Sequence, residues 1–272
     1  MKSVAVIGQG SWGKKIFNSV QNSFSDVQVE MLSSRIFLSS PPKRNFDVIW
    51  IAGRPVDQVK TLELAQSNSK LVILEKPLGS TLSDFSQLDE ILMSTDTKVD
   101  LSRPWCFSNA WLNVRELLNS WMVNEASVTF NRSGPASHSY IPTIEDWIPH
   151  DIYLASDLFP EYETHASIAS FEKSYSETKI SLVLQKNINL RFNFLESDAR
   201  QSKIEIYSNS KLILLDLFNQ TLVVDGEKRN LKSPDEYNEV SRNFIAAANC
   251  NNAKTIQSVR TQKWMKSLID DF

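Results

Sequence analysis

A glycine-rich junction between an apolar run and an amphipathic stretch constrains this sequence most. Only seven of the 272 residues are glycine, yet Gly8, Gly10 and Gly13 all lie within the first thirteen positions. They follow the continuous apolar run Val4–Ile7, which is typical of a buried parallel strand. After them come apolar residues at helical spacing: Trp12, Ile16, Phe17 and Val20. The sequence therefore predicts a strand–turn–helix unit with the three glycines in the turn.

Each glycine of such a turn has a physical role in binding a dinucleotide. The first permits the tight turn, the second lets the backbone approach a pyrophosphate, and the third lets the helix pack closely on the strand. Amide groups at the start of the helix then face the phosphates. We expect the cofactor-binding segment to comprise Gly8, Gly10, Ser11, Trp12 and Gly13. The alternative, a connection that binds nothing, does not need three glycines at this spacing.

The segment after the second predicted strand, Val27–Leu32, indicates which dinucleotide is bound. About twenty residues beyond the glycines, an NAD-binding unit carries an acidic residue that contacts the adenosine ribose. Here the strand ends in Ser33, Ser34 and Arg35, whose groups suit a 2′-phosphate, while Glu30 lies inside the strand. The sequence favours NADP, with NAD as the alternative cofactor and a solvated loop as the alternative role of these three residues.

Strand and helix patterns alternate over the first hundred residues. Further strands are predicted at Phe46–Ala52, Leu71–Leu74 and Lys98–Leu101, and the segment Thr81–Asp84 resembles a capping box that opens a helix. This alternation is typical of a doubly wound parallel sheet, an α/β Rossmann domain, which we assign to residues 1–104. Because ligands bind at the carboxyl ends of such strands, Ala52 and Gly53 join the predicted cofactor site.

The tripeptide Glu75-Lys76-Pro77 follows the fourth predicted strand. A lysine at this edge of the sheet lies toward the nicotinamide end of a bound cofactor and can donate to a substrate hydroxyl or carbonyl. We therefore place Glu75 and Lys76 in the cofactor site, and Lys76 also at the substrate. The alternative is a charged surface turn.

Past Leu101 the pattern changes to a period of two. Strands are predicted at Ala126–Phe130, Ile180–Leu184, Ile188–Phe194, Ile204–Tyr207, Leu212–Leu217 and Thr221–Val224, with a turn at Lys186-Asn187. Helices are predicted at Asn109–Trp121, Tyr237–Ala248 and Thr255–Asp270. These elements indicate an α+β domain over residues 105–272 with an open, mostly antiparallel sheet, one face of which meets water or a second subunit.

A second candidate site lies in the segment Glu145–Ala155. A helix tolerates proline only in its first turn, so the presence of Pro149 predicts that a helix begins with Asp146 as its N-cap. His150, four residues on, then projects from the same end of the helix. An aspartate near a histidine fixes its tautomer and increases its basicity, which suits a general base. The alternative is a capping aspartate beside a half-buried histidine.

In their order and spacing, these three motifs resemble the glucose–fructose oxidoreductase/inositol dehydrogenase (Gfo/Idh/MocA) family over most of the chain. The resemblance implies that His150 takes a hydroxyl proton while a hydride passes to the nicotinamide. It also implies that Asp146 holds the imidazole, that Lys76 stabilises the developing oxyanion, and that the open sheet joins subunits in a homo-oligomer. Two positions depart from the common family pattern, because Ile148 replaces a glycine and Tyr153 replaces an aspartate.

The function that this resemblance implies is NAD(P)-dependent hydride transfer to or from a secondary alcohol or carbonyl of a sugar, nucleotide sugar or cyclitol. Reduction of an imine or conjugated double bond is one alternative, and a non-catalytic dinucleotide-binding sensor or assembly protein is another. The residues expected at the substrate are Lys76, Arg103, Trp105, Trp147, His150 and Tyr153. Arg103 can instead cap its strand, and the tryptophans can instead belong to the core.

Composition argues against several other classes of function. The net charge is −3 and basic residues cluster only in pairs such as Lys14-Lys15, so neither a nucleic acid nor an anionic membrane is an expected partner. The sequence has no apolar run of membrane-spanning length and no signal-peptide pattern, so we expect a cytoplasmic protein. Two cysteines and three histidines without metal-ligand spacing predict no metal site.

Overall fold

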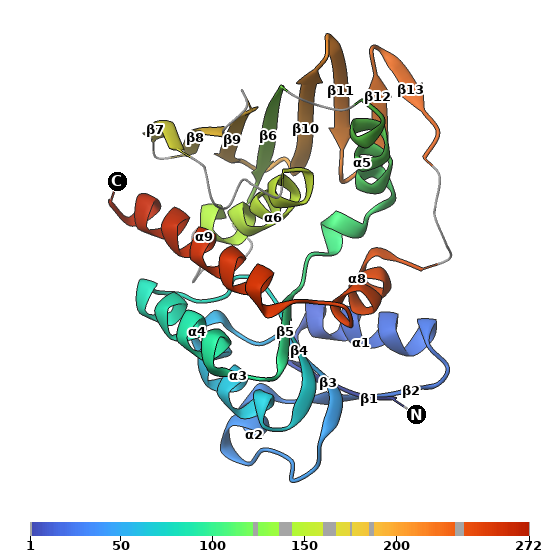
Figure 1. Ribbon diagram of the computed structural model, residues 1–272, viewed down its shortest axis with the longest axis vertical. Coiled ribbons are helices and arrows are strands. Elements are labelled where there is room, and N and C mark those ends of the chain that lie inside the picture. Colours follow the sequence, from blue (N-terminus) through green and yellow to red (C-terminus); the bar gives the residue numbers. More distant parts are fainter. Residues whose placement is uncertain are drawn as a thin grey trace. The chain divides into compact units, whose positions relative to one another are not determined.

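The computed structural model describes residues 2–121, 125–135, 143–159, 167–174, 176–184, 188–231 and 237–271 (Figure 1). The chain forms two compact units, Met1–Pro104 with Tyr237–Asp271, and Trp105–Glu236. Residues 237–271 thus group with residues 1–104 in one compact unit, whereas the domain boundaries predicted from the sequence were 1–104 and 105–272. The turn predicted at Lys186-Asn187 lies outside the described residues.

The first unit is built on a parallel sheet with the strand order β2-β1-β3-β4-β5. Its strands are β1 (Lys2–Ile7), β2 (Val27–Leu32), β3 (Phe46–Ile51), β4 (Ser69–Leu74) and β5 (Lys98–Leu101). The flanking helices are α1 (Ser11–Ser23), α2 (Ser34–Ser39), α3 (Gln58–Gln66), α4 (Leu82–Ser94), α8 (Glu239–Ala247) and α9 (Asn252–Asp271), and a 3₁₀ turn covers Pro55–Asp57. The strand order changes direction between β1 and β3, which is where such a sheet binds its ligand.

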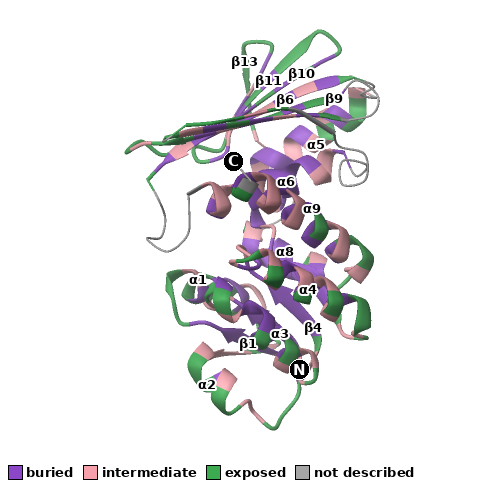
Figure 2. Ribbon diagram, turned by 90° about the vertical axis from the view of Figure 1, so that its left-hand side faces the viewer, coloured by how far each residue is buried: buried purple, intermediate pink, exposed green. Residues whose placement is uncertain are grey.

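The strands β1, β3, β4 and β5 are buried on both faces, whereas the edge strand β2 is only half-buried (Figure 2). One face packs against α1 and α8 in a single apolar cluster formed by Val4, Val6, Ile16, Val20, Val48, Trp50, Leu71, Ile73, Val240, Phe244 and Ala247. Because successive strand residues point to opposite faces, the buried residues Ala5, Ile7 and Ile49 lie on the other one. The apolar side of α8 thus completes the core, which is why the C-terminal segment belongs to this unit.

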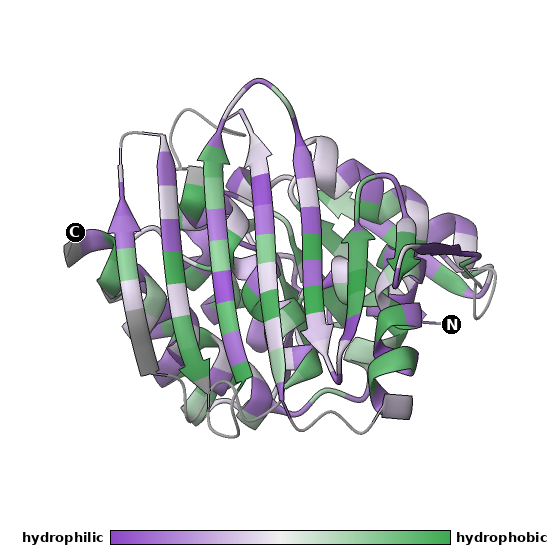
Figure 3. Cartoon of the chain, turned by 90° about the horizontal axis from the view of Figure 1, so that it is seen from above, coloured by the Kyte–Doolittle hydropathy of each residue, from purple (hydrophilic) through white to green (hydrophobic). Residues whose placement is uncertain are grey.

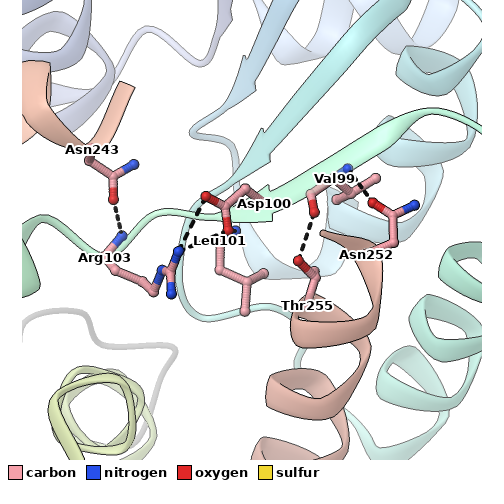
Figure 4. Close-up of polar contacts among 7 residues, drawn as sticks. All are labelled: Val99, Asp100, Leu101, Arg103, Asn243, Asn252 and Thr255. Carbon is pink, nitrogen blue, oxygen red and sulfur yellow. Dashed lines mark hydrogen bonds and ion pairs between the residues drawn. The ribbon is translucent and has the colours of Figure 1, made fainter. Parts of the chain in front are cut away.

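Side chains from the C-terminal segment cover the outer edge of β5 (Figure 4). The Val99 amide donates to Asn252 Oδ1 at 2.9 Å, and Thr255 Oγ1 donates to the Val99 carbonyl at 2.7 Å. The Arg103 amide donates to Asn243 Oδ1 at 2.7 Å. These contacts satisfy backbone groups that an edge strand otherwise leaves without partners in the sheet.

The second unit contains a sheet with the order β13-β12-β11-β10-β6-β9-β8-β7 (Figure 1). Hydrophilic and hydrophobic residues alternate along several of its strands (Figure 3). Its strands are β6 (Ala126–Gly134), β7 (Ser167–Lys173), β8 (Glu177–Leu184), β9 (Ile188–Glu196), β10 (Gln201–Ser208), β11 (Lys211–Asp216), β12 (Thr221–Val224) and β13 (Glu227–Arg229). The pairing is antiparallel except between β6 and β9, which are parallel, so the expected mostly antiparallel sheet is confirmed. The helices are α5 (Asn109–Trp121) and α6 (Thr143–Leu158).

Alternation along the strands explains how this sheet separates its two faces. Buried and half-buried residues alternate along the whole of β6, and on β9 Leu190 and Phe192 are buried whereas Arg191 is exposed. The buried side carries the core, and the other side is polar with a few exposed apolar groups such as Leu214 and Tyr207. The period-two signal in the sequence therefore predicted this arrangement correctly.

Candidate functional site

The turn after β1 has a backbone that only glycine adopts easily. Gly8 has a φ of +128°, and a Cβ atom on it would lie 2.3 Å from the carbonyl oxygen of Ala52, at the end of β3. The Gly8 amide donates to the Leu32 carbonyl of β2 at 2.9 Å. The turn is therefore wedged between the ends of the two neighbouring strands, and a side chain at this position is excluded.

The other two glycines differ in what surrounds them. A Cβ on Gly13 would lie 2.1 Å from the Gly8 carbonyl oxygen, so this residue lets α1 approach the turn. A Cβ on Gly10 would meet nothing within 4 Å. Gly10 is the N-cap of α1, and it offers no side-chain acceptor to the first amides, nor does the first turn contain an acidic residue. The uncapped helix start and the open space where a Gly10 side chain would lie fit a phosphate anion.

The residues predicted to bind the adenosine end lie next to this turn. Ser33 is the N-cap of α2, and Ser34 and Arg35 begin that short helix, so the segment is helical where the sequence suggested a loop. Ser34 Oγ lies 3.1 Å from the position of a Cβ on Gly53, so the structure brings Ser34 and the end of β3 together. Arg35 is exposed. Glu30 forms an ion pair with Arg44, in agreement with its poor placement for a ribose.

Lys76 follows β4 at the same edge of the sheet, and its peptide bond to Pro77 is cis. The preceding Glu75 is buried, and its Oε1 accepts a hydrogen bond from Trp50 Nε1 at 3.0 Å. Burial raises the pKa of Glu75. This rise is opposed by groups that favour the ionised form, namely Ser102, Trp12, Trp50 and the charge of Lys76. Trp50 was not among the predicted site residues, because its apolar surroundings in β3 indicated only a core position.

Arg103 lies just beyond β5 and is held within the first unit. Its Nη2 contacts both carboxylate oxygens of the buried Asp100, at 3.2 and 3.3 Å (Figure 4). The guanidinium therefore braces the end of its own strand, which is the alternative role recognised in the sequence. Its predicted contact with substrate stays a prediction.

Helix α6 of the second unit carries four of the predicted residues. Asp146 and Tyr153 are buried, whereas Trp147 and His150 are half-buried. The helix begins at Thr143, so Asp146 lies in its first turn and is not the N-cap, and Pro149 lies inside the helix. This corrects the expected start, because the helix extends one turn further back than the proline suggests. The spacing of four residues still places Asp146 and His150 on one face.

Trp105 stands beside His150. The Trp105 ring meets the imidazole edge-on, with the ring centres 6.2 Å apart. Phe218, which is about half exposed, packs edge-on against Trp105, with the ring centres 5.7 Å apart. The structure thus brings the predicted residues Trp105 and His150 together and adds Phe218, which the sequence analysis missed. Trp147 packs at the end of β6, 3.3 Å from the position of a Cβ on Gly134.

An ion pair that involves Asp151, the residue after His150, was also missed. Arg132 of β6 and Asp151 of α6 are both buried, and three guanidinium–carboxylate contacts of 2.6 to 2.8 Å join them. Burial raises the pKa of Asp151, and the charge and hydrogen bonds of Arg132 oppose that rise. The signal was present in the sequence, because Arg132 occupies an inward-facing position in the alternation of Val128 and Phe130.

Comparison with known proteins identifies the fold. No protein-family model matches the sequence, and no curated protein matches it. Solved structures do: the dehydrogenase MviM from Clostridium difficile is 15% identical, with a TM-score of 0.78 over 100% of this chain and 99% of that chain. UDP-N-acetylglucosamine 3-dehydrogenase GnnA from Acidithiobacillus ferrooxidans is 14% identical, with a TM-score of 0.71 over 96% and 95%. Apo scyllo-inositol dehydrogenase from Lactobacillus casei is 11% identical, with a TM-score of 0.68 over 96% and 94%.

The chain has the fold of these solved structures. In this fold the glycine turn and Lys76 belong to the first unit, and His150 and Trp105 belong to the second. Over the described ranges, no helix has both the length and the apolar character needed to span a bilayer. Within the same ranges, no three His, Cys, Asp or Glu side chains gather into a group that could hold a metal ion.

Proposed function

We propose that this protein is an NAD(P)-dependent oxidoreductase of the Gfo/Idh/MocA family, with NADP preferred. Its reaction is hydride transfer to or from a secondary alcohol or carbonyl of a sugar, nucleotide sugar or cyclitol. The observation that carries the proposal is the turn at Gly8, Gly10 and Gly13, with open space beside the uncapped start of α1. The sugar and cyclitol dehydrogenases among the structural neighbours support the substrate class.

The residues around the turn suit the parts of a nicotinamide dinucleotide. Amides of Gly10, Ser11 and Trp12 would hold the pyrophosphate, while Gly8 and Gly13 shape the turn. Ser33, Ser34 and Arg35 would hold a 2′-phosphate. Ala52, Gly53, Glu75 and Lys76, at the ends of β3 and β4, would lie along the rest of the molecule. When bound, the nicotinamide supplies the hydride acceptor or donor.

The chain's own side chains would manage the proton. His150 would accept the substrate's hydroxyl proton during oxidation and return it during reduction, and Asp146 would orient the imidazole. Lys76 would stabilise negative charge on the substrate oxygen. Trp105, Trp147 and Tyr153 would contact the sugar, with Arg103 at an anionic group if the sugar carries one. Phe218, beside Trp105, would extend this surface.

A matched pair of glycine variants tests the cofactor site. Gly10→Ala adds a methyl group that meets no protein atom, so we expect its unfolding free energy to stay within about 0.5 kcal/mol of the wild type. NADPH fluorescence should show an affinity at least roughly tenfold weaker, because the methyl group would occupy the phosphate space. Gly13→Ala should lose both stability and binding. Unchanged NADPH affinity in Gly10→Ala would remove the basis of the proposal.

Turnover variants test the chemistry. Lys76→Met should retain NADPH binding and lose turnover on the sugar or cyclitol that the wild type uses. Activity only on C=N or conjugated C=C compounds in a substrate panel would replace the substrate class, and tight NADPH binding without turnover would favour a sensor.

The preference for NADP is tested at Arg35. Arg35→Ala should weaken NADPH binding and spare NADH binding; equal losses would assign the guanidinium another role.

We propose that the exposed face of the second unit's sheet joins two copies of the chain. Arg191 and Glu205 flank Thr129 on the strands either side of β6, and both are exposed. A twofold axis through Thr129 would set Arg191 of one copy opposite Glu205 of the other. Arg191→Glu should shift the mass measured by light scattering toward the monomer, and adding Glu205→Arg should restore it. A mass that stays constant in all three proteins would refute this pairing.

A further inference from the structure

Glu75 is anchored at three points within the first unit. Its amide donates to the Ile51 carbonyl at 3.0 Å, and its own carbonyl accepts a hydrogen bond from Gln58 Nε2 at 3.0 Å. Its side-chain Oε1 accepts from Trp50 Nε1, also at 3.0 Å. Only 4% of the residue is exposed. Backbone and side chain of the residue before Lys76 are therefore both fixed.

The groups that hold Glu75 are themselves immobilised by packing. Trp50 and Gln58 are each 1% exposed. The Trp50 ring stacks on Phe244 of α8, with ring centres 6.3 Å apart and planes 8° from parallel. Gln58 begins α3. The arrangement, here called the Glu75 clamp (Glu75, Trp50 and Gln58), links β3, β4 and α3 and is backed by α8.

The groups around the Glu75 carboxyl differ in charge. Burial raises the pKa of Glu75. The groups that favour its ionised form are Ser102 at the β5 end, Trp12 of α1 and Trp50 of β3, all uncharged, and then the charge of Lys76. Lys76 is therefore the charged member of this set, and the attraction between an ionised Glu75 and the Lys76 ammonium is mutual.

We propose that Glu75 is a positioning residue for Lys76: the clamp fixes the backbone from which the lysine projects and holds a carboxylate beside its ammonium group. This inference rests on the proposed role of Lys76 in the reaction. If the role of Glu75 were purely structural, glutamine could replace it, because a neutral glutamine can accept the Trp50 hydrogen bond and present the same backbone carbonyl to Gln58. Glutamine cannot supply the negative charge.

The first experiment therefore compares kinetics of Glu75→Gln with the wild type. We expect kcat to fall about tenfold while KM and NADPH affinity stay within about twofold. The wild-type kcat should also decline on the acid side as the Glu75 carboxyl gains a proton, and the variant should lack that limb. Trp111→Phe is the matched control, because it removes an indole donor to Asp157 in the other unit and should leave the acid limb unchanged. Wild-type kcat and pH profile in Glu75→Gln would overturn the proposal.

A second measurement does not depend on turnover. The pKa of Glu75 can be measured from the infrared band of its protonated carboxyl, followed as a function of pH. The band is assigned by subtracting the spectrum of the matching protein that carries Glu75→Gln. Lys76→Met should raise that pKa, because the neighbouring cation is lost, and Trp50→Phe should raise it by removing a donor. An unchanged value in Lys76→Met would refute the coupling even in an active enzyme. A protein that shows the shift but reduces no substrate would instead refute the proposed function.

Discussion

The two units each bury a carboxyl group near a proposed catalytic residue, and they stabilise it in different ways. Asp151, next to His150, is bound by the Arg132 guanidinium through three short contacts. Glu75, next to Lys76, is bound by a neutral indole, with other neutral groups facing it. In the second unit the Asp151 charge is paired with Arg132, and the pair fixes α6 against β6. In the first unit we propose that the ionised Glu75 carboxyl interacts with Lys76. The difference teaches that burial alone does not tell a structural carboxylate from one that acts on its neighbour.

The largest effect should come from removing one partner of the ion pair between Arg132 and Asp151. Arg132→Met leaves Asp151 buried without its cation, and we expect a loss of about 3 to 5 kcal/mol in unfolding free energy by urea denaturation. Lys179→Met is the control within the same unit, because its pair with Glu177 is exposed to solvent and its removal should leave the unfolding free energy nearly unchanged. A loss in Arg132→Met no larger than that of the control would contradict the contrast.

Removing both charges should restore part of the loss. Arg132→Met combined with Asp151→Leu leaves no unpaired charge in the core, so the double variant should be more stable than Arg132→Met by about 2 kcal/mol or more. The same denaturation experiment measures it. A double variant at or below the stability of the single one would mean that the pair is required for packing and not merely for mutual neutralisation.

A smaller effect should appear as a pH dependence of stability in the first unit. The folded pKa of Glu75 is raised above its ordinary value of 4.5, so the folded state binds its proton more tightly than the unfolded state. The stability contributed by the protonated form is present below 4.5 and is lost as the pH rises through the folded pKa. The stability of Glu75→Gln relative to the wild type should therefore increase as the pH rises from 4.5 to the folded pKa and level off above it. A difference that stays constant with pH would show that the carboxyl ionises without cost.

The smallest effect should come from an exposed carboxylate. Contacts with Lys70 and Ser3 lower the pKa of Asp47 to about 2. Its contribution to stability is present at neutral pH and is lost as the pH falls toward that value, the opposite direction to Glu75. Asp47→Asn should lower the melting temperature slightly at pH 7, and the difference should vanish near pH 2. A difference that persists there would have a cause other than charge.

Much of the fold could be predicted because its signals are local. The boundaries expected for Lys98–Leu101 and Asn109–Trp121 match β5 and α5, and Thr81 and Asp84 form the predicted capping box. Other elements gave no clear local signal: α2 is short, β13 has only exposed residues, and β7 was missed. The grouping of α8 with the first unit depends on Phe244 meeting Trp50, a contact between distant parts of the sequence.

The candidate site divides in the same way. Gly8 and Gly13 could be identified because the backbone itself demands glycine there. Arg132 and Asp151 could not be paired from the sequence, because their contact depends on how α6 lies on β6. The same holds for Trp50 and Glu75, which neighbouring strands bring together. Local conformation can be predicted from short segments, whereas contacts between side chains of distant segments form only when the strands and helices pack together.

The sealing of β5 by Asn252 and Thr255 has a consequence for protein synthesis. All five strands of the parallel sheet have been made once residue 104 is added, yet 132 residues of the other unit, 105–236, are translated before the segment that covers the edge. At about 5 to 20 residues per second, this interval lasts roughly 7 to 26 seconds. During translation the nascent sheet therefore carries an unprotected edge and an uncovered apolar face, and the first unit is completed last.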